Sequence, residues 1–342
     1  MKKFGATAGA IVLALSAVTT ADAQTRLVVQ GSANAGDFVQ TFYESWAGKF
    51  NAMTGDKGPK LEVLPFQAIV PYRETIDATA AGLIAGDMSS ISYFSGRDPA
   101  FAILGDLVAA YDTPEQATMF CLNGGGKEVL QKVYDKLNPG KLHVVGCGTF
   151  TKEALVASKP IYGLADLKGV KMRAPEGLAA DLFARVGASP VSLPYSEVFT
   201  SIETGLIEAA DASSYASNKS AGLHKVATYP LYPGIHSMAM NQLVISKDQW
   251  DKLTPGEQTT LEVWYAAMIT SLGRASDLED RLEVAEDKAA GKLTIIDWPQ
   301  KDRDAFRVAA KDVWEEAAKK SDLAAEALEA HLTFMKNIGL AN

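Results

Sequence analysis

Strand-like and helix-like segments alternate along most of this chain, and this alternation limits the fold more than any other feature. The apolar segment 26–32 is typical of a strand and precedes an amphipathic helix that ends near Gly55. Residues 59–66 repeat the strand pattern and residues 72–86 the helical one. Such alternation is typical of layered α/β folds. No internal repeat of about 20 to 50 residues, which would indicate a solenoid, is visible.

The alternation continues to the C-terminus, but the predicted strands become shorter in the second half. The first half is predicted to add a strand at 89–94, helices at 98–110, 114–121 and 126–137, and a strand at 141–148. The strands predicted after it are shorter, at 153–159, 170–174, 189–194 and 207–213. A long extended run at 236–250 is followed by a mostly helical tail from Pro255, with one strand at 292–298 and final helices at about 300–320 and 322–338.

The chain length favours two domains over one. A chain of 342 residues is longer than one small hydrophobic core needs. Since no Pro-rich or Ser-rich linker is present, we expect several crossings between the domains. Two α/β lobes joined in this way leave a cleft near the carboxyl ends of their strands, where ligands bind in open α/β sheets.

The first 23 residues are predicted to be a secretory signal peptide. Lys2 and Lys3 precede an apolar run from about residue 11 to 18, and Ala21-Asp22-Ala23 fits a cleavage site near Ala23. The run is shorter than the roughly 20 residues that span a bilayer. We therefore expect an exported, soluble, periplasmic protein.

The net charge limits the possible binding partners, and the cysteines bear on whether a disulfide forms. Loss of the signal peptide's two lysines and one aspartate lowers the formal net charge from -8 to -9. An acidic surface argues against nucleic acid or anionic lipid as a partner, although a pocket can still be locally positive. Cys121 and Cys147 are the only cysteines. A disulfide and two buried thiols are both compatible with the sequence.

Motifs for catalysis are missing. No G-x-S-x-G elbow exposes a serine nucleophile, and the histidines, at 143, 224, 236 and 331, form no H-E-x-x-H motif. The "NGGGKEVL" segment (123–130) lacks the spacing of a phosphate-binding loop and is interpreted as a turn before a helix. We therefore predict no catalytic residues, with a secreted hydrolase as the alternative class.

A charged residue instead marks a candidate binding site. Arg173 ends the short strand of "LKGVKMRAPEG", where the next element turns away. Its guanidinium is always charged and fits a carboxylate with two parallel hydrogen bonds. Tyr195 and Asp211 follow neighbouring predicted strands, so all three are expected at the same edge of one sheet.

Three ordered motifs resemble the solute-binding subunits of tripartite ATP-independent periplasmic (TRAP) transporters. These are "DLKGVKMR" (166–173), "GASPVSLP" (187–194) and "EVFTSIETG" (197–205), and "VISKDQWDKLTPGEQ" (244–258) is similar to a fourth. "YFSGRDPAFAIL", "NGGGKEVLQKVYDKLNP" and "SAGLHKVATYPLYPGIH" resemble the branch that includes 2-oxo acid binders. The resemblance covers nearly all of the predicted mature chain.

This resemblance implies a type II-like periplasmic binding protein, an α/β fold with a ligand cleft between two lobes, a long crossing strand and a helical C-terminal tail. Lobe I is expected to comprise 24–146 plus about 241–290. Lobe II, with the C-terminal helices, is expected to comprise about 147–240 plus about 291–342.

The resemblance also implies a function. The protein is expected to close around a small organic anion, a 2-oxo acid or similar carboxylate, and to deliver it to the TRAP membrane permease subunits. An organosulfonate or an aromatic carboxylate is the alternative ligand, and a sensor that docks on a receptor is an alternative role. Arg173 is expected to form a bidentate salt bridge with the ligand carboxylate. The further predicted ligand-binding residues are Tyr93, Thr149, Phe150, Ser213, Ser214, Tyr215, His236 and Ser237.

Two departures from the 2-oxo acid branch affect a metal ion, Na⁺ or Ca²⁺, that bridges ligand and protein there. That branch has a Glu-Trp pair where this chain has Asp211-Ala212, and a glutamate where this chain has Ser237. Asp211 remains a candidate ligand for such a cation, while the second carboxylate is absent. Members of the branch also form dimers through C-terminal helices. The apolar stripe Leu323, Leu328, Leu332 and Met335 is the candidate homodimer surface.

Overall fold

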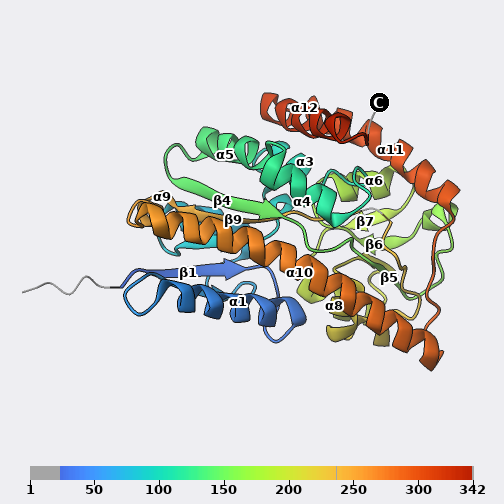
Figure 1. Ribbon diagram of the computed structural model, residues 1–342. Helices are drawn as coiled ribbons and strands as arrows, with labels where there is room; N and C mark the ends of the chain where they lie inside the picture. Colours follow the sequence, from blue (N-terminus) through green and yellow to red (C-terminus); the bar gives the residue numbers. More distant parts are fainter. Residues whose placement is uncertain (1–23, 236, 341–342) are drawn as a thin grey trace, which may run out of the picture.

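Two β-sheets with helices packed around them form the protein (Figure 1). The structure is a computed structural model and describes residues 24–235 and 237–340. The predicted signal peptide therefore lies outside the described residues. The α/β fold with two sheets and long C-terminal helices confirms the predicted fold class.

The first sheet has five strands and forms the centre of lobe I. Its order is β2-β1-β3-β9-β4, with β1, β2 and β3 parallel and β9 antiparallel to both of its neighbours. Buried apolar side chains explain the strand pattern, since Leu27 and Val29 are fully buried. The strands are β1 (Arg26–Gly31), β2 (Lys60–Leu64), β3 (Gly86–Met88), β4 (Leu142–Gly148) and β9 (Asn241–Ser246).

Helices cover both faces of this sheet. Several of the long helices begin at a side chain that caps their free N–H groups, such as Asp37 before α1 and Thr113 before α4. Thr113 and Gln116 form a capping box, with Pro114 at the first helical position. The helices of this lobe are α1 (Phe38–Thr54), α2 (Thr75–Ala80), α3 (Ala100–Gly105), α4 (Pro114–Asn123), α5 (Gly126–Leu137) and α9 (Lys247–Trp250).

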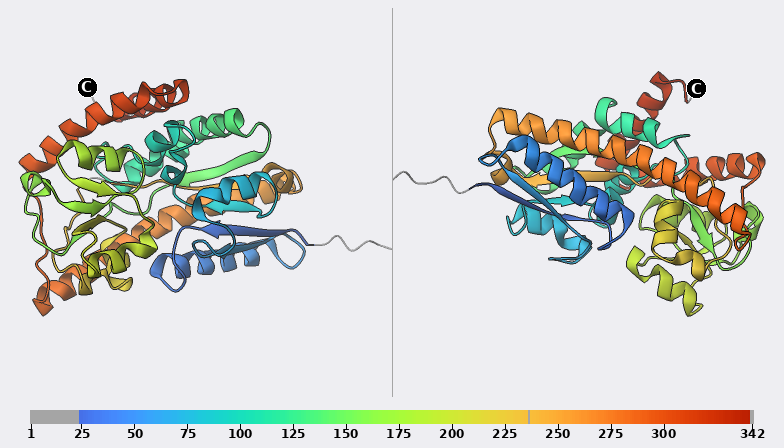
Figure 2. Two further views of the ribbon diagram at one scale, coloured as in Figure 1. Left: turned by 180° about the vertical axis from the view of Figure 1, so that it is seen from behind. Right: turned by 60° about the horizontal axis from the view of Figure 1, so that its bottom comes forward.

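The second sheet has four short strands and forms the centre of lobe II. Its order is β5-β8-β6-β7, in which β6 is parallel to β7 and β8, and β5 is antiparallel to β8. The strands are β5 (Leu155–Ala157), β6 (Lys171–Arg173), β7 (Ser189–Val191) and β8 (Ala209–Asp211). The helices α6 (Leu178–Arg185), α7 (Val198–Glu203) and α8 (Tyr215–Ser220) flank it. Both sheets and their helices are visible from behind and from below in Figure 2.

Two neighbouring segments connect the sheets. Residues 149–154 lead from β4 to β5, and residues 237–240 lead into β9. They are hydrogen-bonded to each other, since the Glu153 N–H donates to the Ser237 carbonyl at 2.9 Å. The extended run predicted at 236–250 contains only one regular strand, the six residues of β9.

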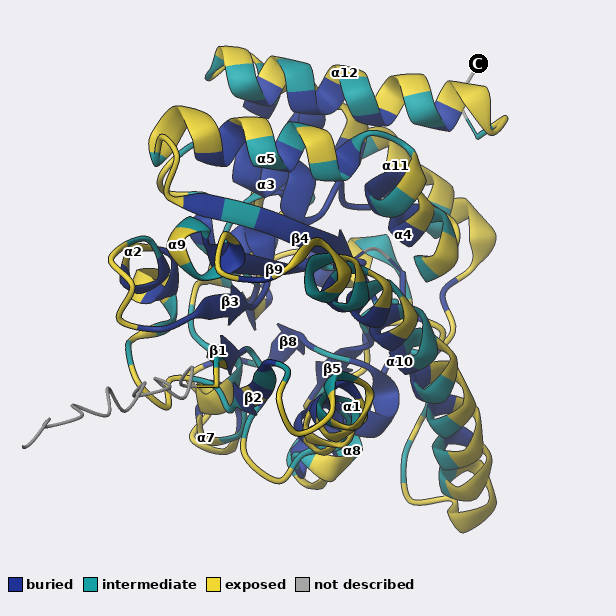
Figure 3. Cartoon of the chain, turned by 60° about the vertical axis from the view of Figure 1, so that its left-hand side comes forward, coloured by how far each residue is buried: buried dark blue, intermediate teal, exposed yellow. Residues whose placement is uncertain are grey.

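One helix contacts both lobes. Helix α10 (Pro255–Ala290) has 36 residues, begins at a capping box of Thr254 and Glu257, and ends at Gly291 with φ 64°. Its first half buries Trp264 and other apolar side chains against the five-stranded sheet and α1. Its second half packs on α8 of lobe II. Figure 3 shows its buried positions along one side and its exposed positions along the other.

Of the two C-terminal helices, the first contacts both lobes and the second contacts lobe I. Helix α11 (Gln300–Ala318) packs on α6 and α3, and α12 (Asp322–Asn337) packs on α3 and α5. Within the candidate dimer stripe, Leu328 and Met335 are buried and Leu323 is partly buried against the protein's own core. Only Leu332 of the four is exposed, at 42%. Most of the stripe therefore packs within the chain.

Cys121 and Cys147 form a disulfide, which decides between the two alternatives left by the sequence. The bond joins α4 to the end of β4, with a Cα–Cα distance of 5.6 Å. It therefore fixes the last residues of β4 immediately before the chain leaves the five-stranded sheet.

Two predicted strands are wrong. Residues 91–94 form a 3₁₀ helix, because Ile91 and Phe94 are both buried at the three-residue spacing of that helix. Residues 292–298 contribute only an isolated bridge between Leu231 and Ile296. Among the helices of residues 24–235 and 237–340, none combines the length and the hydropathy needed to cross a membrane.

Candidate functional site

A cavity of about 80 Å³ lies between the two lobes. Lobe I contributes Ser32, Asp37, Ser90, Ser92, Tyr93 and Asn241 to its lining. Lobe II and the connecting segment contribute Phe150, Thr151, Glu153, Arg173, Tyr195 and Ser213. The cavity therefore combines one guanidinium, two carboxyl groups and many hydroxyls, which suits a small polar solute.

Arg173 is placed at the cavity by the end of strand β6. Arg173 is only 5% exposed. In the sheet it pairs with Val191 of β7 and Ala210 of β8. The Nε atom donates to the carbonyl of Leu193 at 3.1 Å and Nη1 donates to the carbonyl of Asp211 at 2.5 Å. These two contacts fix the plane of the guanidinium group.

The positive charge of Arg173 has no ion-pair partner among the described residues. The salt bridges found in residues 24–235 and 237–340 involve other cations, and Nη2 of Arg173 donates to no described atom. Carbonyl oxygens satisfy N–H donors without neutralising a charge. A buried guanidinium in this state favours an anion from outside the protein.

Two carboxyl groups lie close together beside Arg173. Burial first, and the neighbouring Asp211 carboxyl second, raise the pKa of Glu153 well above its ordinary value, while Arg173 opposes the shift. Glu153 lines the cavity, and Asp211 is fully buried at the end of β8. Burial and the Asp211 carboxyl therefore favour the protonated form of Glu153 next to the guanidinium.

The structure brings four of the predicted ligand-binding residues to the cavity. Arg173, Tyr93, Phe150 and Ser213 all line it. Burial raises the pKa of Tyr93 to about 12, so its hydroxyl keeps its proton at neutral pH and can donate a hydrogen bond.

Four other predicted residues point elsewhere. Thr149 lines a separate groove between α4 and α10. Ser214 caps α8 by accepting the N–H of Ser217 at 3.2 Å, and the hydroxyl of Tyr215 donates to Asp287 at 2.9 Å. Ser237 donates its hydroxyl to the carboxylate of Asp106. None of the four lines the cavity, and His236 lies outside the described residues.

Glu153 and Asp37 are the cavity carboxyls that sequence reasoning missed. Asp37 is conspicuous in the sequence only as a helix cap, a role it has by accepting the N–H groups of Asn34 and Gln40. Glu153 precedes a short apolar strand, in a segment without periodicity. A charged residue directly before such a strand was the one available signal for it.

The described residues do not fit a resident Na⁺ or Ca²⁺. They contain no group of three or more His, Cys, Asp or Glu side chains placed to hold a metal ion. Ser237 occupies the place of a carboxylate, and its hydroxyl is bound to Asp106. Because Ca²⁺ requires six to eight oxygen ligands, the side chains around Asp211 supply too few.

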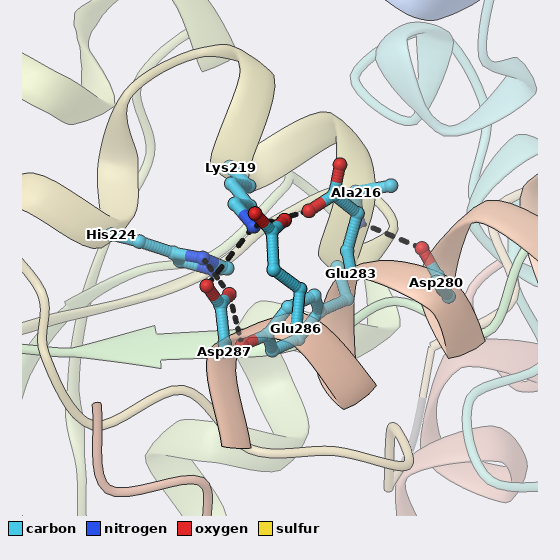
Figure 4. A network of polar contacts seen from close by, with 8 residues as sticks. Ala216, Lys219, His224, Asp280, Glu283, Glu286 and Asp287 are labelled. Atoms are coloured by element: carbon cyan, nitrogen blue, oxygen red, sulfur yellow. Dashed lines mark hydrogen bonds and ion pairs between the residues drawn. The ribbon is translucent and has the colours of Figure 1, made fainter. Parts of the chain in front are cut away.

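A second cation, Lys219, lies among carboxylates where α8 meets α10, away from the cavity lining (Figure 4). The Lys219 ammonium forms ion pairs with Glu283, with Glu286 at 2.9 Å and with Asp287 at 3.0 Å. Burial disfavours the charge of Lys219, but these hydrogen bonds raise its pKa above the ordinary value. The protein itself therefore supplies the anions for this cation.

Two α/β lobes around a small cavity, with a buried guanidinium that has no ion-pair partner in residues 24–235 and 237–340, are typical of a two-lobed binding protein. The model of the bacterial extracellular solute-binding proteins, family 7, matches residues 30–321. The chain belongs to this family.

Known relatives agree with this assignment. A TRAP periplasmic solute-binding protein from Rhodobacter sphaeroides, solved as an apo open structure, is 37% identical, with a TM-score of 0.75 over 92% of this chain and 99% of that one. A monocarboxylate 2-oxoacid-binding periplasmic protein of Nostoc sp. is 26% identical over 82% of this chain and 76% of its own length. The chain is therefore a solute-binding protein of the TRAP type, a family that binds solutes and is not a family of enzymes.

The same fold accommodates other ligands. A TRAP solute-binding protein from Chromohalobacter salexigens, solved with (S)-2-amino-1-propanol, is 20% identical, with a TM-score of 0.80 over 92% of this chain and 96% of that one. At this identity the likeness concerns the fold alone.

Proposed function

We propose that this protein captures a small organic acid in the periplasm and delivers it to the membrane subunits of a TRAP transporter, without catalysing a reaction. The observation that carries this proposal is the buried guanidinium of Arg173, which lines the cavity and has no ion-pair partner among the described residues. In this role its Nη2 donates to one oxygen of the acid, while the backbone contacts of Nε and Nη1 hold the group in place.

Cleft closure supplies the rest of the binding energy. The lining comes from both lobes, so a solute in the cavity contacts both and stabilises the closed arrangement. Closure excludes water from the Arg173 contact, which strengthens a charge-assisted hydrogen bond. Micromolar affinity corresponds to about -8 kcal/mol, which a few such contacts in a closed cleft can supply.

A 2-oxo acid or a similar carboxylate is the first candidate solute, and a monocarboxylate 2-oxoacid binder is among the relatives. An organosulfonate is the second, because its three oxygens can accept hydrogen bonds from Nη2 of Arg173 and from the hydroxyls of Ser90, Ser92 and Ser213. The volume of about 80 Å³ holds on the order of five to eight water-sized groups.

A thermal-shift screen tests the proposed function. Carboxylates and sulfonates are added with and without Na⁺ or Ca²⁺, and a ligand at 100 times its dissociation constant is expected to stabilise the protein by about 2.7 kcal/mol. The shift should disappear in the Arg173→Ala variant. A screen without any shift, or an equal shift in Arg173→Ala, would overturn the proposal. Product formation in the same mixtures would support a hydrolase instead.

Further parts of this proposal have their own tests. Signal-peptide cleavage near Ala23 is checked by N-terminal sequencing of the exported protein. Neighbouring genes for a large and a small membrane subunit would favour transport over a receptor-docking sensor. A homodimer is checked by sedimentation, although most of the α12 stripe packs inside the chain.

A further inference from the structure

An ion pair joins the two lobes close to the cavity. Arg73 of lobe I, in the 3₁₀ turn that precedes α2, forms a salt bridge with Glu176 of lobe II. Neither residue belongs to the segments 149–154 and 237–240 that connect the sheets, so the pair is an additional contact between the lobes. The two side chains are 54% and 28% exposed. The pair can therefore separate without leaving a charge buried.

The backbone next to Glu176 also touches lobe I. Gly177 has a φ angle of 99°, and a Cβ atom there would lie 3.0 Å from the Cβ of Ala102 and 3.1 Å from the hydroxyl oxygen of Ser95. This spacing is closer than an ordinary van der Waals contact, so the glycine allows the lobes to approach each other. The turn at 175–177 thus meets lobe I through a charge and through a close backbone contact.

On lobe II this turn is continuous with the binding site. Arg173 and Pro175 both line the cavity. The N–H of Ala174, between them, donates to the carbonyl of Val191 at 3.2 Å. Helix α6 begins directly after Gly177. The turn is therefore tied to the sheet at one end and to α6 at the other, so it moves together with Arg173.

On lobe I an aromatic contact connects Arg73 to the cavity. The guanidinium of Arg73 lies 5.1 Å from the ring centre of Tyr72, and this ring meets the ring of Tyr93 edge to face with their centres 4.9 Å apart. Tyr93 lines the cavity. The carbonyl of Arg73 also accepts a hydrogen bond from Nη2 of Arg97 at 3.3 Å, which holds its backbone in lobe I. Both members of the ion pair are thus joined to the cavity wall of their own lobe.

We propose that Arg73 and Glu176 are positioning residues that form a latch, which holds the lobes closed after a solute has bound to Arg173. This inference rests on the proposed function and concerns how the same site closes. When the lobes part, the two charges separate into water and the close contact at Gly177 is lost. Because an ion pair of this exposure contributes little free energy, the latch sets the lifetime of the closed state and does not replace the Arg173 contact.

Charge reversal tests the latch. Arg73→Glu places two carboxylates opposite each other and should speed the release of a bound acid about threefold or more. Stopped-flow fluorescence measures this rate, with pyruvate and isethionate as the probes. The exchanged pair, Arg73→Glu with Glu176→Arg, should recover slow release. In about 1 M NaCl the difference between Arg73→Glu and the wild type should shrink, since salt screens exposed charges.

Small-angle scattering measures closure without depending on release of a probe. With and without pyruvate or isethionate, the radius of gyration should be larger for Arg73→Glu than for the wild type in at least one mixture, because the lobes spend more time apart. The exchanged pair should return it to the wild-type value.

A matched pair of glycines tests the close backbone contact. Gly177→Ala should also speed release about threefold or more, because its methyl group would collide with Ala102 and Ser95 in the closed arrangement. Gly205→Ala is the control, since Gly205 lies in the same lobe with a φ angle of 73° and nothing lies within 4 Å of a Cβ atom there. It adds backbone strain alone and should leave release unchanged. Melting of each variant shows whether it is folded.

Three results would overturn the proposal. These are equal release rates and equal radii of gyration for Arg73→Glu and the wild type in every mixture, an exchanged pair that behaves like Arg73→Glu, or the same effect of Gly177→Ala and Gly205→Ala. The proposed function is judged separately. Arg173-dependent binding of an acid that no latch variant affects would preserve the function and exclude the latch, whereas a charge-dependent change in the radius of gyration without binding of any acid would support the latch and exclude the function.

Discussion

Two buried or half-buried cations, Arg173 and Lys219, occupy opposite situations in lobe II. Lys219 faces three carboxylates of α10, which the protein supplies itself. Arg173 has carbonyl oxygens for two of its donors and no described carboxylate for its charge. The comparison shows that the partners of the two cations distinguish them better than their burial does. The protein neutralises Lys219 itself, and for Arg173 we propose that the partner is a ligand.

The largest expected effect is on ligand affinity at Arg173. Replacing Arg173 with Met should weaken binding of the preferred acid at least about 100-fold, equivalent to about 2.7 kcal/mol. The free energy of unfolding of the ligand-free protein should change by less than about 1 kcal/mol, because losing two hydrogen bonds is offset by removing an uncompensated charge. Calorimetry and urea denaturation measure the two quantities, and a large loss of stability with unchanged affinity would reverse the assignment.

Lys219→Met should have the opposite pattern of effects, with a loss of stability and little change in ligand affinity. Without the ammonium group, Glu283, Glu286 and Asp287 repel one another, so the free energy of unfolding should fall by about 1–3 kcal/mol. Ligand affinity should change less than about threefold. Adding Glu283→Gln to Lys219→Met should restore part of the stability, and a strictly additive double variant would contradict the network.

Stability should depend on pH through Asp280, which accepts the N–H of Ala216 at 2.8 Å beside the Lys219 cluster. Burial raises the pKa of Asp280 from 3.8 to about 6. The stability that Asp280 contributes is therefore fully present below pH 3.8 and is lost as the pH rises to about 6. Relative to the wild type, Asp280→Asn should gain about 1.4 kcal/mol per pH unit across this window.

His224 should make stability depend on pH in the opposite direction to Asp280. Burial lowers its pKa from 6.5 to about 4, so the stability it contributes is present above pH 6.5 and is lost as the pH falls to about 4. His224→Gln should therefore gain stability relative to the wild type as the pH falls through this range. Urea denaturation at several pH values checks both variants, and parallel curves for the two would refute the assigned burial effects.

The smallest effect is expected at an exposed ion pair of the same lobe. Arg185 of α6 bonds Asp312 and Glu316 of α11 at the protein surface. Water and salt replace such contacts readily, so Arg185→Ala should leave both the melting temperature and the ligand affinity unchanged within error. A clear shift in the melting temperature would show that an exposed ion pair stabilises this lobe as the Lys219 contacts do.

The sequence was sufficient to predict Arg173, because a cation at the end of an apolar strand is visible in the pattern and in the family motifs. It was insufficient for Glu153, whose segment has no periodicity and is fixed by its neighbour across the lobes, the carbonyl of Ser237. Ser214 and Tyr215 were assigned to the ligand because they follow β8. In the structure Ser214 caps α8, and this turn directs Tyr215 toward α10.

The secondary structure was likewise predictable only where local spacing decides it. Long amphipathic helices such as α5 and α12 lie within a residue or so of their predicted bounds, since their apolar spacing is decided locally. The segment 91–94 is not decided locally. Its apolar residues suit a strand and a 3₁₀ turn equally, and packing in the core selects the turn.

Helix α10 acts as a mechanical strut across the two lobes. Its 36 residues correspond to a rod of about 54 Å. Its second half packs on α8, so a rotation between the lobes would change this contact unless α8 moves together with the helix. Lys219 of α8 bonds three carboxylates of α10 at once. These ion pairs therefore couple α8 to the helix that contacts both lobes.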